Sequence, residues 1–430
     1  MLAHGVGGRS DLPLPLWLAA YGAALALLIS FVALRILWPR PLLARLSVSG
    51  AVPSPLQALR RPAHLVLRVV GLALFALTLS ASIVGSDQTV ANVAPYAVCV
   101  VFWVGVALAS AIVGDVFRAA NPFDTIAIAL RIPEATGRPD PGAWPGAVML
   151  LSFAWLELAY HEGCGDPRAL AWWLSGYSVA ALVGARVWGR SWLRTGEGFA
   201  ALLGLFARLA PLHWDAVSGR LRLRAPLSGL ASVRETTGTL AVVVVALGST
   251  TFDGFTRSQI WNDIVGQRIG WDRTVVSTVG LLWVIGVVAG CWLAVTRVTA
   301  RMLDRDPTEI ATMFVASLVP IALGYAVAHY FSLLVFDGQS FLVLLSDPFA
   351  RGWDVFGTTD HLIDYRLVSA RTIAYVQVAS IVVGHIAGVV VAHDRAVEAF
   401  EPRDATRSQY PLLAVMILYT VAGLLLLLGG

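Results

Sequence analysis

Histidine and carboxylate side chains lie within or at the ends of long apolar segments of this chain. His329 lies inside the apolar stretch 318–336, where an ionisable group costs about 3 kcal/mol or more unless it finds a partner. Glu157 and His161 are four residues apart and share one face of a helix, and Asp253 lies in the sequence STTFDGF. Imidazole and carboxylate groups bind zinc, manganese or iron, and they also relay protons. We therefore predict either a divalent metal site (Zn or Mn) or a proton relay formed by His329, Asp253, Glu157 and His161.

Two further acids lie in the segment SDPFARGWDVFGTTDH, which begins at Ser346. If a metal-bound water attacks an electrophilic centre, a carboxylate nearby can act as a base or orient the ligands. Asp347 and Asp354 are therefore the candidate catalytic residues. Asp347 precedes Pro348, so a turn is an equally good interpretation of that position.

Two histidines lie in a later apolar segment and suggest haem or helix packing. His385 is part of GHIAG, in which Gly384 and Gly388 would let a neighbouring helix approach closely, and His393 lies two turns further on. One haem b bridging His329 and His385 is disfavoured, because their expected depths in the membrane differ by about 10 Å. No CxxCH occurs, so covalent haem attachment is excluded.

The composition is that of a membrane protein with many spans. Of the 430 residues, 57% are hydrophobic and 13% are charged, which is far from a soluble domain. All the basic residues are arginine, and a net charge of +4 gives no reason to expect nucleic acid binding. The chain has no Walker loop, GxSxG, HExxH or dinucleotide fingerprint. Among the three cysteines, Cys99 and Cys164 could pair, but we expect them to be unpaired small residues.

An all-α membrane bundle in a single transmembrane domain, residues 1–430, is the predicted fold. A span needs about 20 apolar residues. A shorter apolar segment, 197–211, is predicted to be an interfacial helix. The ten predicted spans are 16–38, 64–84, 95–115, 143–161, 169–188, 236–256, 274–296, 310–336, 372–393 and 410–429.

Arginine placement predicts the orientation of these spans. The loops after the first, third, fifth, seventh and ninth spans carry 20 arginines, the opposite side carries 8, and the remaining three lie in span ends. Positive residues concentrate on the cytoplasmic side, so both termini are expected outside. Glu157, His161, Asp253, His329 and Asp347 are then expected near the outer leaflet.

Several motifs together resemble bacterial multi-pass membrane proteins of the fenitrothion hydrolase-like family. These motifs run in order through most of residues 85–395, and they include GDVFRAANPFD, FAWLELAY, TTFDGF, VPIALGYAVAHYFSLL, GQSFLVLLSDPFARGWDVFGT and VVGHIAGVVVAH. The resemblance implies hydrolysis of phosphotriester bonds in the bacterial cytoplasmic membrane and leaves open a second subunit. His161 lies outside any matched motif. The matched positions are Asp115, Asn121, Glu157, Asp253, His329, Asp347, Trp353, Asp354, His385 and His393.

Three classes of function therefore remain open. The leading hypothesis is a metal-dependent hydrolytic site near the outer leaflet. One alternative is a non-hydrolytic membrane subunit that binds haem b or docks a redox partner. The other is a proton-coupled transporter that uses the same polar residues. In each case the lipid bilayer is the expected environment.

Overall fold

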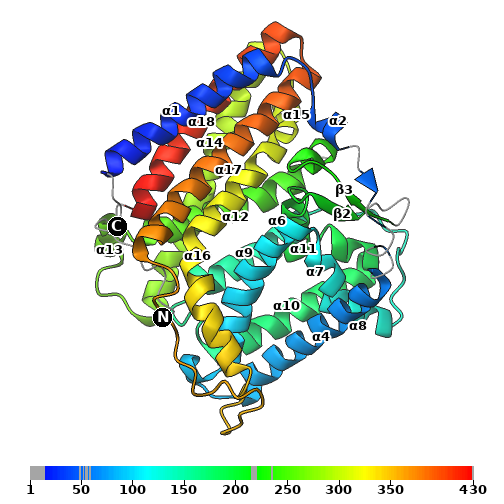
Figure 1. Cartoon of the computed structure of the whole chain (residues 1–430), viewed down its shortest axis with the longest axis vertical. Coiled ribbons are helices and arrows are strands. Elements are labelled where there is room, and N and C mark those ends of the chain that lie inside the picture. Colours follow the sequence, from blue (N-terminus) through cyan, green and yellow to red (C-terminus); the bar gives the residue numbers. More distant parts are fainter. Residues whose placement is uncertain are drawn as a thin grey trace.

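The computed structural model describes residues 15–47, 50–51, 53, 57, 60–214, 220–233 and 236–428. Both chain ends lie outside these ranges, so the sidedness expected for the termini and the last residue of the span 410–429 are not described. Within them the chain is a bundle of helices (Figure 1). The long helices are α1 (Leu16–Leu37), α4 (Arg60–Val84), α9 (Trp144–Leu158), α10 (Pro167–Trp188), α12 (Thr237–Thr256), α14 (Gly270–Leu303), α16 (Leu318–Leu344), α17 (Ala370–Ala399) and α18 (Pro402–Leu428).

The third predicted span is built from three consecutive helical segments. They are α5 (Val93–Tyr96), the π-helix η3 (Ala97–Val106) and α6 (Ala107–Val113). Across the described part of the chain, eight helical stretches are long and apolar enough to cross a membrane. The prediction of a multi-pass membrane bundle is thus confirmed. Of the ten predicted spans, the two outside this group correspond to α9, which is apolar but shorter, and α10.

Short elements connect the long helices. They are α2 (Leu43–Leu46), η2 (Thr89–Ala91), α7 (Val116–Ala120), α8 (Pro122–Ala129), η4 (Arg190–Arg194), α11 (Gly198–Phe206), η5 (Ser228–Ser232), α13 (Gln259–Val265), α15 (Pro307–Met313) and η6 (Val315–Ser317). One small antiparallel sheet is the exception to the all-α prediction. Its strands are β1 (Gly50–Ala51), β2 (Leu212–Trp214) and β3 (Leu221–Leu223), in the order β1-β3-β2.

The segment expected to lie as an interfacial helix over 197–211 differs from that prediction. Its helix, α11, is shorter and packs against α9, α6 and α12 within the bundle. Phe199 is 2% exposed and contacts the rings of Phe102, Trp103 and Phe153. Buried Glu197 caps the helix by accepting hydrogen bonds from the backbone N–H groups of Phe199 and Ala200. Aromatic packing on several sides therefore keeps α11 inside, whereas its sequence is apolar enough to suit an interface equally well.

Helices α16 and α17 pack together along the middle of the bundle (Figure 1), and three glycines allow their close approach. A Cβ on Gly384 would lie 2.8 Å from the carbonyl oxygen of Pro320, and one on Gly388 would lie 2.8 Å from that of Ser317. On the other helix, a Cβ on Gly324 would lie 2.5 Å from the carbonyl oxygen of Ser380. The interpretation of GHIAG as a close helix contact is confirmed.

Cys99 and Cys164 form a disulfide, which contradicts the expectation that they are unpaired. Cys99 lies in η3, and Cys164 lies in the connection between α9 and α10. Their Cα atoms are 6.5 Å apart, which is within the usual range for a disulfide. Sequence spacing could not reveal this pairing, because it depends on how two helix ends pack.

Candidate functional site

A buried histidine–carboxylate pair joins α16 to α12. His329 Nδ1 lies 3.3 Å from Asp253 Oδ2, and the two side chains are 2% and 4% exposed. Asp253 lies in the last turn of α12, and His329 lies in the middle of the longer α16. The apolar faces of the two helices pack together and bring the polar groups into contact. The partner that an intramembrane histidine requires is therefore Asp253.

Three other side chains complete the cluster around this pair. Arg257, the residue that follows α12 and lies four positions after Asp253, places its Nη2 atom 3.8 Å from Asp253 Oδ2. Half-buried Glu157 on α9 is close enough to Asp253 and Tyr330 for electrostatic interaction with both. Sequence reasoning missed Arg257 and Tyr330. The signals that could have found them are the i, i+4 spacing from Asp253 and the position next to His329.

The ionisable groups of this cluster do not balance without an additional proton. Asp253 and Glu157 each carry a negative charge when ionised, and Arg257 supplies one permanent positive charge. The remaining group, His329, is positive only when it is protonated. Full ionisation of both acids beside a neutral imidazole would leave one uncompensated negative charge in a water-poor environment, which is strongly disfavoured. The cluster therefore favours holding a proton, either on His329 or on one of the two carboxyl groups.

A small cavity lies next to His329. It has a volume of about 20 Å³, and its lining includes His329, Gly254, Thr251, Tyr325 and Tyr419. A cavity of this size holds about one water molecule. A Cβ on Gly254 would lie 3.2 Å from His329 Cε1 and 3.6 Å from Nε2, so that glycine leaves room for the edge of the ring opposite Asp253. The cavity can therefore bring water to His329 but cannot hold a larger molecule.

The predicted metal site is not assembled in the structure. His161 is bonded to Thr274 through both its backbone N–H and its ring Nδ1, and its ring packs against Tyr160 and Trp271. Of the four predicted ligands, only His329 and Asp253 form a direct contact. In the described ranges, no group of three or more histidine, cysteine, aspartate or glutamate residues is placed to hold a metal ion. His161 was grouped with the others because it shares a helix face with Glu157, but the helix ends at Leu158 and the chain turns away.

Asp347 and Asp354, the predicted catalytic residues, organise the loop after α16. Asp347 accepts hydrogen bonds from the backbone N–H groups of Arg351 and Gly352, at 2.8 and 2.7 Å. Asp354 accepts one from the Ser346 hydroxyl and one from the N–H of Thr358. Desolvation acts to raise the pKa of Asp354, but these hydrogen bonds outweigh it and hold the pKa below its ordinary value. Both carboxylates therefore serve as turn-forming acceptors, the alternative that the sequence already allowed for Asp347.

His385 is fully buried against aromatic rings. Its Nδ1 lies 2.8 Å from the carbonyl oxygen of Ile381, and its Nε2 has no hydrogen-bond partner among the described residues. The ring lies 5.8 Å from that of Tyr325 and 6.1 Å from that of Tyr419, measured between centroids. His385 is thus enclosed by other side chains, with 0% of its surface exposed. His393 has both ring nitrogens within 3.0 Å of oxygen atoms, so neither is free to ligate haem iron.

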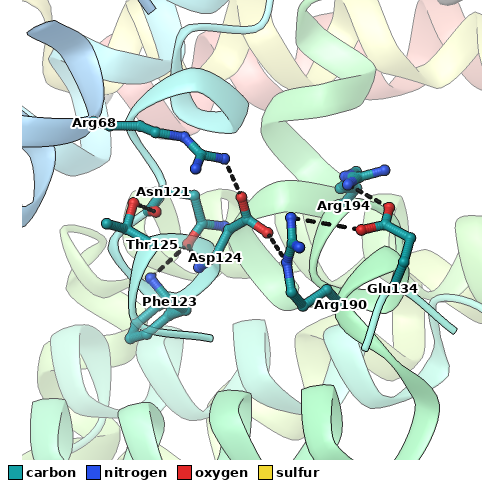
Figure 2. Close-up of polar contacts among 8 residues, drawn as sticks. All are labelled: Arg68, Asn121, Phe123, Asp124, Thr125, Glu134, Arg190 and Arg194. Carbon is teal, nitrogen blue, oxygen red and sulfur yellow. Dashed lines mark hydrogen bonds and ion pairs between the residues drawn. The ribbon is translucent and has the colours of Figure 1, made fainter. Parts of the chain in front are cut away.

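A second polar cluster lies at the other end of the bundle, around the motif NPFD (Figure 2). Asn121 caps α8 by accepting hydrogen bonds from the N–H groups of Phe123 and Asp124, and Pro122 occupies the first turn. This cap fixes the position of Asp124, whose carboxylate binds Arg68 of α4 and Arg190 of η4.

Glu134 extends this second cluster. It pairs with Arg190 at 3.5 Å and with Arg194 at 2.5 Å (Figure 2). Asp124 and Glu134 thus form ion pairs with three arginines, so their negative charges are compensated without an additional proton. The motif gave a signal for the helix cap, but the arginine partners come from distant segments and were missed.

Comparison with known proteins adds nothing to this geometry: no family model, no curated protein and no solved structure matches the chain. The resemblance to the fenitrothion hydrolase-like family therefore stays a prediction. The properties on which a function can be based are those of the two clusters.

Proposed function

We propose that the chain is a proton-coupled transporter of the bacterial cytoplasmic membrane, and that His329, Asp253 and Glu157 bind the proton. The observation that carries the proposal is the charge imbalance of a buried cluster in which His329 Nδ1 lies 3.3 Å from Asp253 Oδ2. Coupling of transport to protons requires a group that is neutral in one protonation state and charged in the other. Protonation of such a group changes the free energy of the buried site. Ionisable side chains inside membrane bundles commonly serve proton relays in pumps and transporters.

The proposed topology has ten crossings with both termini outside. α9 and α10 supply the two crossings beyond the eight longer apolar stretches, although the 15 residues of α9 span only about 22 Å. The disulfide between Cys99 and Cys164 supports this orientation, because disulfides persist in oxidising compartments and both cysteines then lie outside. Maleimide labelling of Gln88→Cys from outside intact cells, and of Ala135→Cys only after permeabilisation, is the expected result. The reverse pattern would invert the topology.

The cavity favours a proton over a larger reactant as the ligand of this cluster. About 20 Å³ accommodates one water molecule, whereas a phosphotriester is many times larger. Protons move along hydrogen-bonded water and side chains, so they need no wide channel. A transported solute would bind elsewhere or in another conformation, as alternating access requires.

Nitrogen-15 NMR of histidine-labelled protein in lipid nanodiscs tests the proton site. We expect the cluster to hold one proton, either on the His329 ring or on a carboxyl group of Asp253 or Glu157, and the His329→Gln variant assigns the ring signals. Asp253→Asn removes the adjacent carboxylate and should change the His329 ring signals, whereas the matched variant Asp347→Asn should leave them unchanged. A neutral His329 ring at pH 7, together with infrared bands that show both carboxyl groups ionised, would contradict the proposal.

Hydrolysis of phosphotriesters is the second candidate. The observation in its favour is that Asp253 orients His329 Nδ1 and leaves the opposite edge of the ring on the water-sized cavity, as in a histidine general base. Diethyl p-nitrophenyl phosphate is a suitable probe, tested with and without added zinc or manganese. We expect no turnover above that of empty nanodiscs. Turnover that disappears in His329→Gln would instead favour the hydrolase.

A further inference from the structure

The inner end of α17 carries a second buried histidine–carboxylate combination, formed by His393 and Asp394. These residues are 4% and 0% exposed. They face the end of α1, the linker that follows it and the start of α18. α16 and α17 run in opposite directions across the proposed membrane, so His393, at the end of α17, lies near the cytoplasmic side, and His329 on α16 lies nearer the outer side.

Both ring nitrogens of His393 face hydrogen-bond acceptors. Nδ1 lies 3.0 Å from Gln409 Oε1, and Nε2 lies 3.0 Å from the backbone carbonyl oxygen of Trp38. A backbone carbonyl can only accept. The orientation of the Gln409 amide is fixed as well, because its Nε2 donates to the carbonyl oxygen of Ala405 at 2.6 Å. Reversing that amide would place two oxygen atoms against each other.

Hydrogen-bond counting then determines the protonation state of the ring. A neutral imidazole carries one N–H and one lone pair, whereas an imidazolium donates from both nitrogens. A neutral His393 would bring a nitrogen lone pair against a carbonyl oxygen at one of its two contacts, in a buried position where neither group can turn to water. Only the imidazolium forms both hydrogen bonds.

Asp394 follows His393 on α17 and is fully buried. Its Oδ1 accepts hydrogen bonds from Trp38 Nε1 at 3.0 Å and from the backbone N–H groups of Leu42 and Leu43 at 2.7 and 3.2 Å. Three donors on one oxygen stabilise the ionised carboxylate. Trp38 is shared, because its carbonyl accepts from His393 and its indole donates to Asp394.

Arg395 and Glu398 of α17, and Asp404 and Arg407 of α18, have contacts away from His393, whereas the described part of the structure gives no side-chain contact for Arg35, Arg40, Arg45, Glu401 or Arg403. Arg395 donates to the carbonyl oxygens of Leu230 and Val233 and pairs with Glu398. On α18, Asp404 and Arg407 pair with each other, and their side chains are 48% and 43% exposed. The linker presents backbone N–H groups to Asp394. His393 and Asp394 are thus linked through Trp38, which both of them contact.

We propose that His393 is held as an imidazolium and forms, with Asp394, a buried proton-binding site that docks the end of α1. Loss of this proton would remove one of the two hydrogen bonds of the ring. The protonation state rests on the hydrogen bonds alone. Its use as the cytoplasmic end of a proton path rests on the proposed function.

The same nitrogen-15 spectra test this site. At pH 7 we expect two protonated ring nitrogens for His393, assigned with His393→Gln. His385 is the internal control: only its Nδ1 has a partner among the described residues, so it should show a single N–H. A single N–H on His393 at pH 7 overturns the proposal.

A substitution of the acceptor Gln409 gives a second test, which does not depend on whether His393→Gln folds correctly. Gln409→Leu removes the oxygen facing Nδ1 and leaves Trp38 to accept from Nε2. We expect His393 in this variant to have one N–H at pH 7. Retention of both would contradict the hydrogen-bond explanation. If His393 behaves as expected while neither the His329 ring nor the carboxyl groups of Asp253 and Glu157 hold a proton, the proposed function fails and this site stands. The opposite pattern removes the His393 site and leaves the function in place.

Discussion

Two buried aspartates at opposite ends of the bundle have different kinds of partner. Asp124 binds two arginines, with Arg190 Nε at 3.0 Å from Oδ1 and Arg68 bound to Oδ2 (Figure 2). Asp253 lies 3.3 Å from an imidazole and 3.8 Å from a single arginine, and it shares its surroundings with Glu157. The exposed fractions of the two residues are similar, 6% for Asp124 and 3% for Asp253.

The difference lies in whether the charge balance depends on pH. Arginine stays protonated at any physiological pH, so the pairing of Asp124 is permanent and serves to hold α4, α8 and η4 together. Around Asp253 the balance is completed by a titratable proton. A permanently paired carboxylate suits a structural role, and a proton-dependent one suits a functional role.

The largest effect on stability is expected in the second polar cluster, around Asp124. Asp124→Asn leaves Arg68 and Arg190 without their carboxylate. We expect the free energy of unfolding to fall by about 2 kcal/mol, less than for fully buried pairs because both arginines are partly exposed. Thermal unfolding in detergent measures the change.

Asp253→Asn is the matched control for that substitution. It removes one acid from a cluster with too few cations, so we expect a smaller loss of stability than in Asp124→Asn at pH 7. If Asp253→Asn is the more destabilising of the two, Asp253 is mainly a structural residue and the distinction between the two ends is wrong.

The sequence predicts the helices of this chain well because the signal for a membrane span is local. Long apolar runs define α1, α4, α14, α16, α17 and α18, and helix caps such as Asn121 before Pro122 can be recognised from adjacent residues. α16 continues to Leu344, beyond the predicted end of the eighth span at residue 336. Its last two turns contain polar residues that a hydropathy argument excludes.

The site could be predicted only in part. An isolated histidine in an apolar segment indicates that a partner exists, and Asp253 was among the candidates. His161 lies beyond the end of α9 and contacts Thr274 instead of the pair, and the i, i+4 spacing of Arg257 from Asp253 was a signal that went unused. Several polar residues can lie at the same depth in the membrane. Helix rotation and packing decide which of them are in contact, and sequence spacing does not reveal either.

A smaller effect is expected at Gly254. It tests whether His329, in the cluster around Asp253, is the residue that exchanges the proton. A Cβ at this position would lie 3.2 Å from His329 Cε1 and 3.4 Å from Leu426 Cβ, so Gly254→Ala presses on the ring from the cavity side. We expect a loss of about 1 kcal/mol, as for mild overpacking, with a change in the His329 nitrogen-15 signals. Gly290→Ala is the control, because a Cβ there meets nothing within 4 Å and alanine favours the helix.

The ring has two ways to respond to this added methyl group, and they differ in outcome. If His329 is clamped by Asp253, the ring cannot turn away, and the methyl group fills the water-sized cavity. Proton exchange at His329 then slows while its contact with Asp253 persists. If the ring is loosely held, it rotates, the contact with Asp253 is lost and exchange is faster. Slower exchange in Gly254→Ala, with no change in Gly290→Ala, indicates that the proton reaches His329 through this cavity. Unchanged exchange would place its route on the side of Arg257 instead.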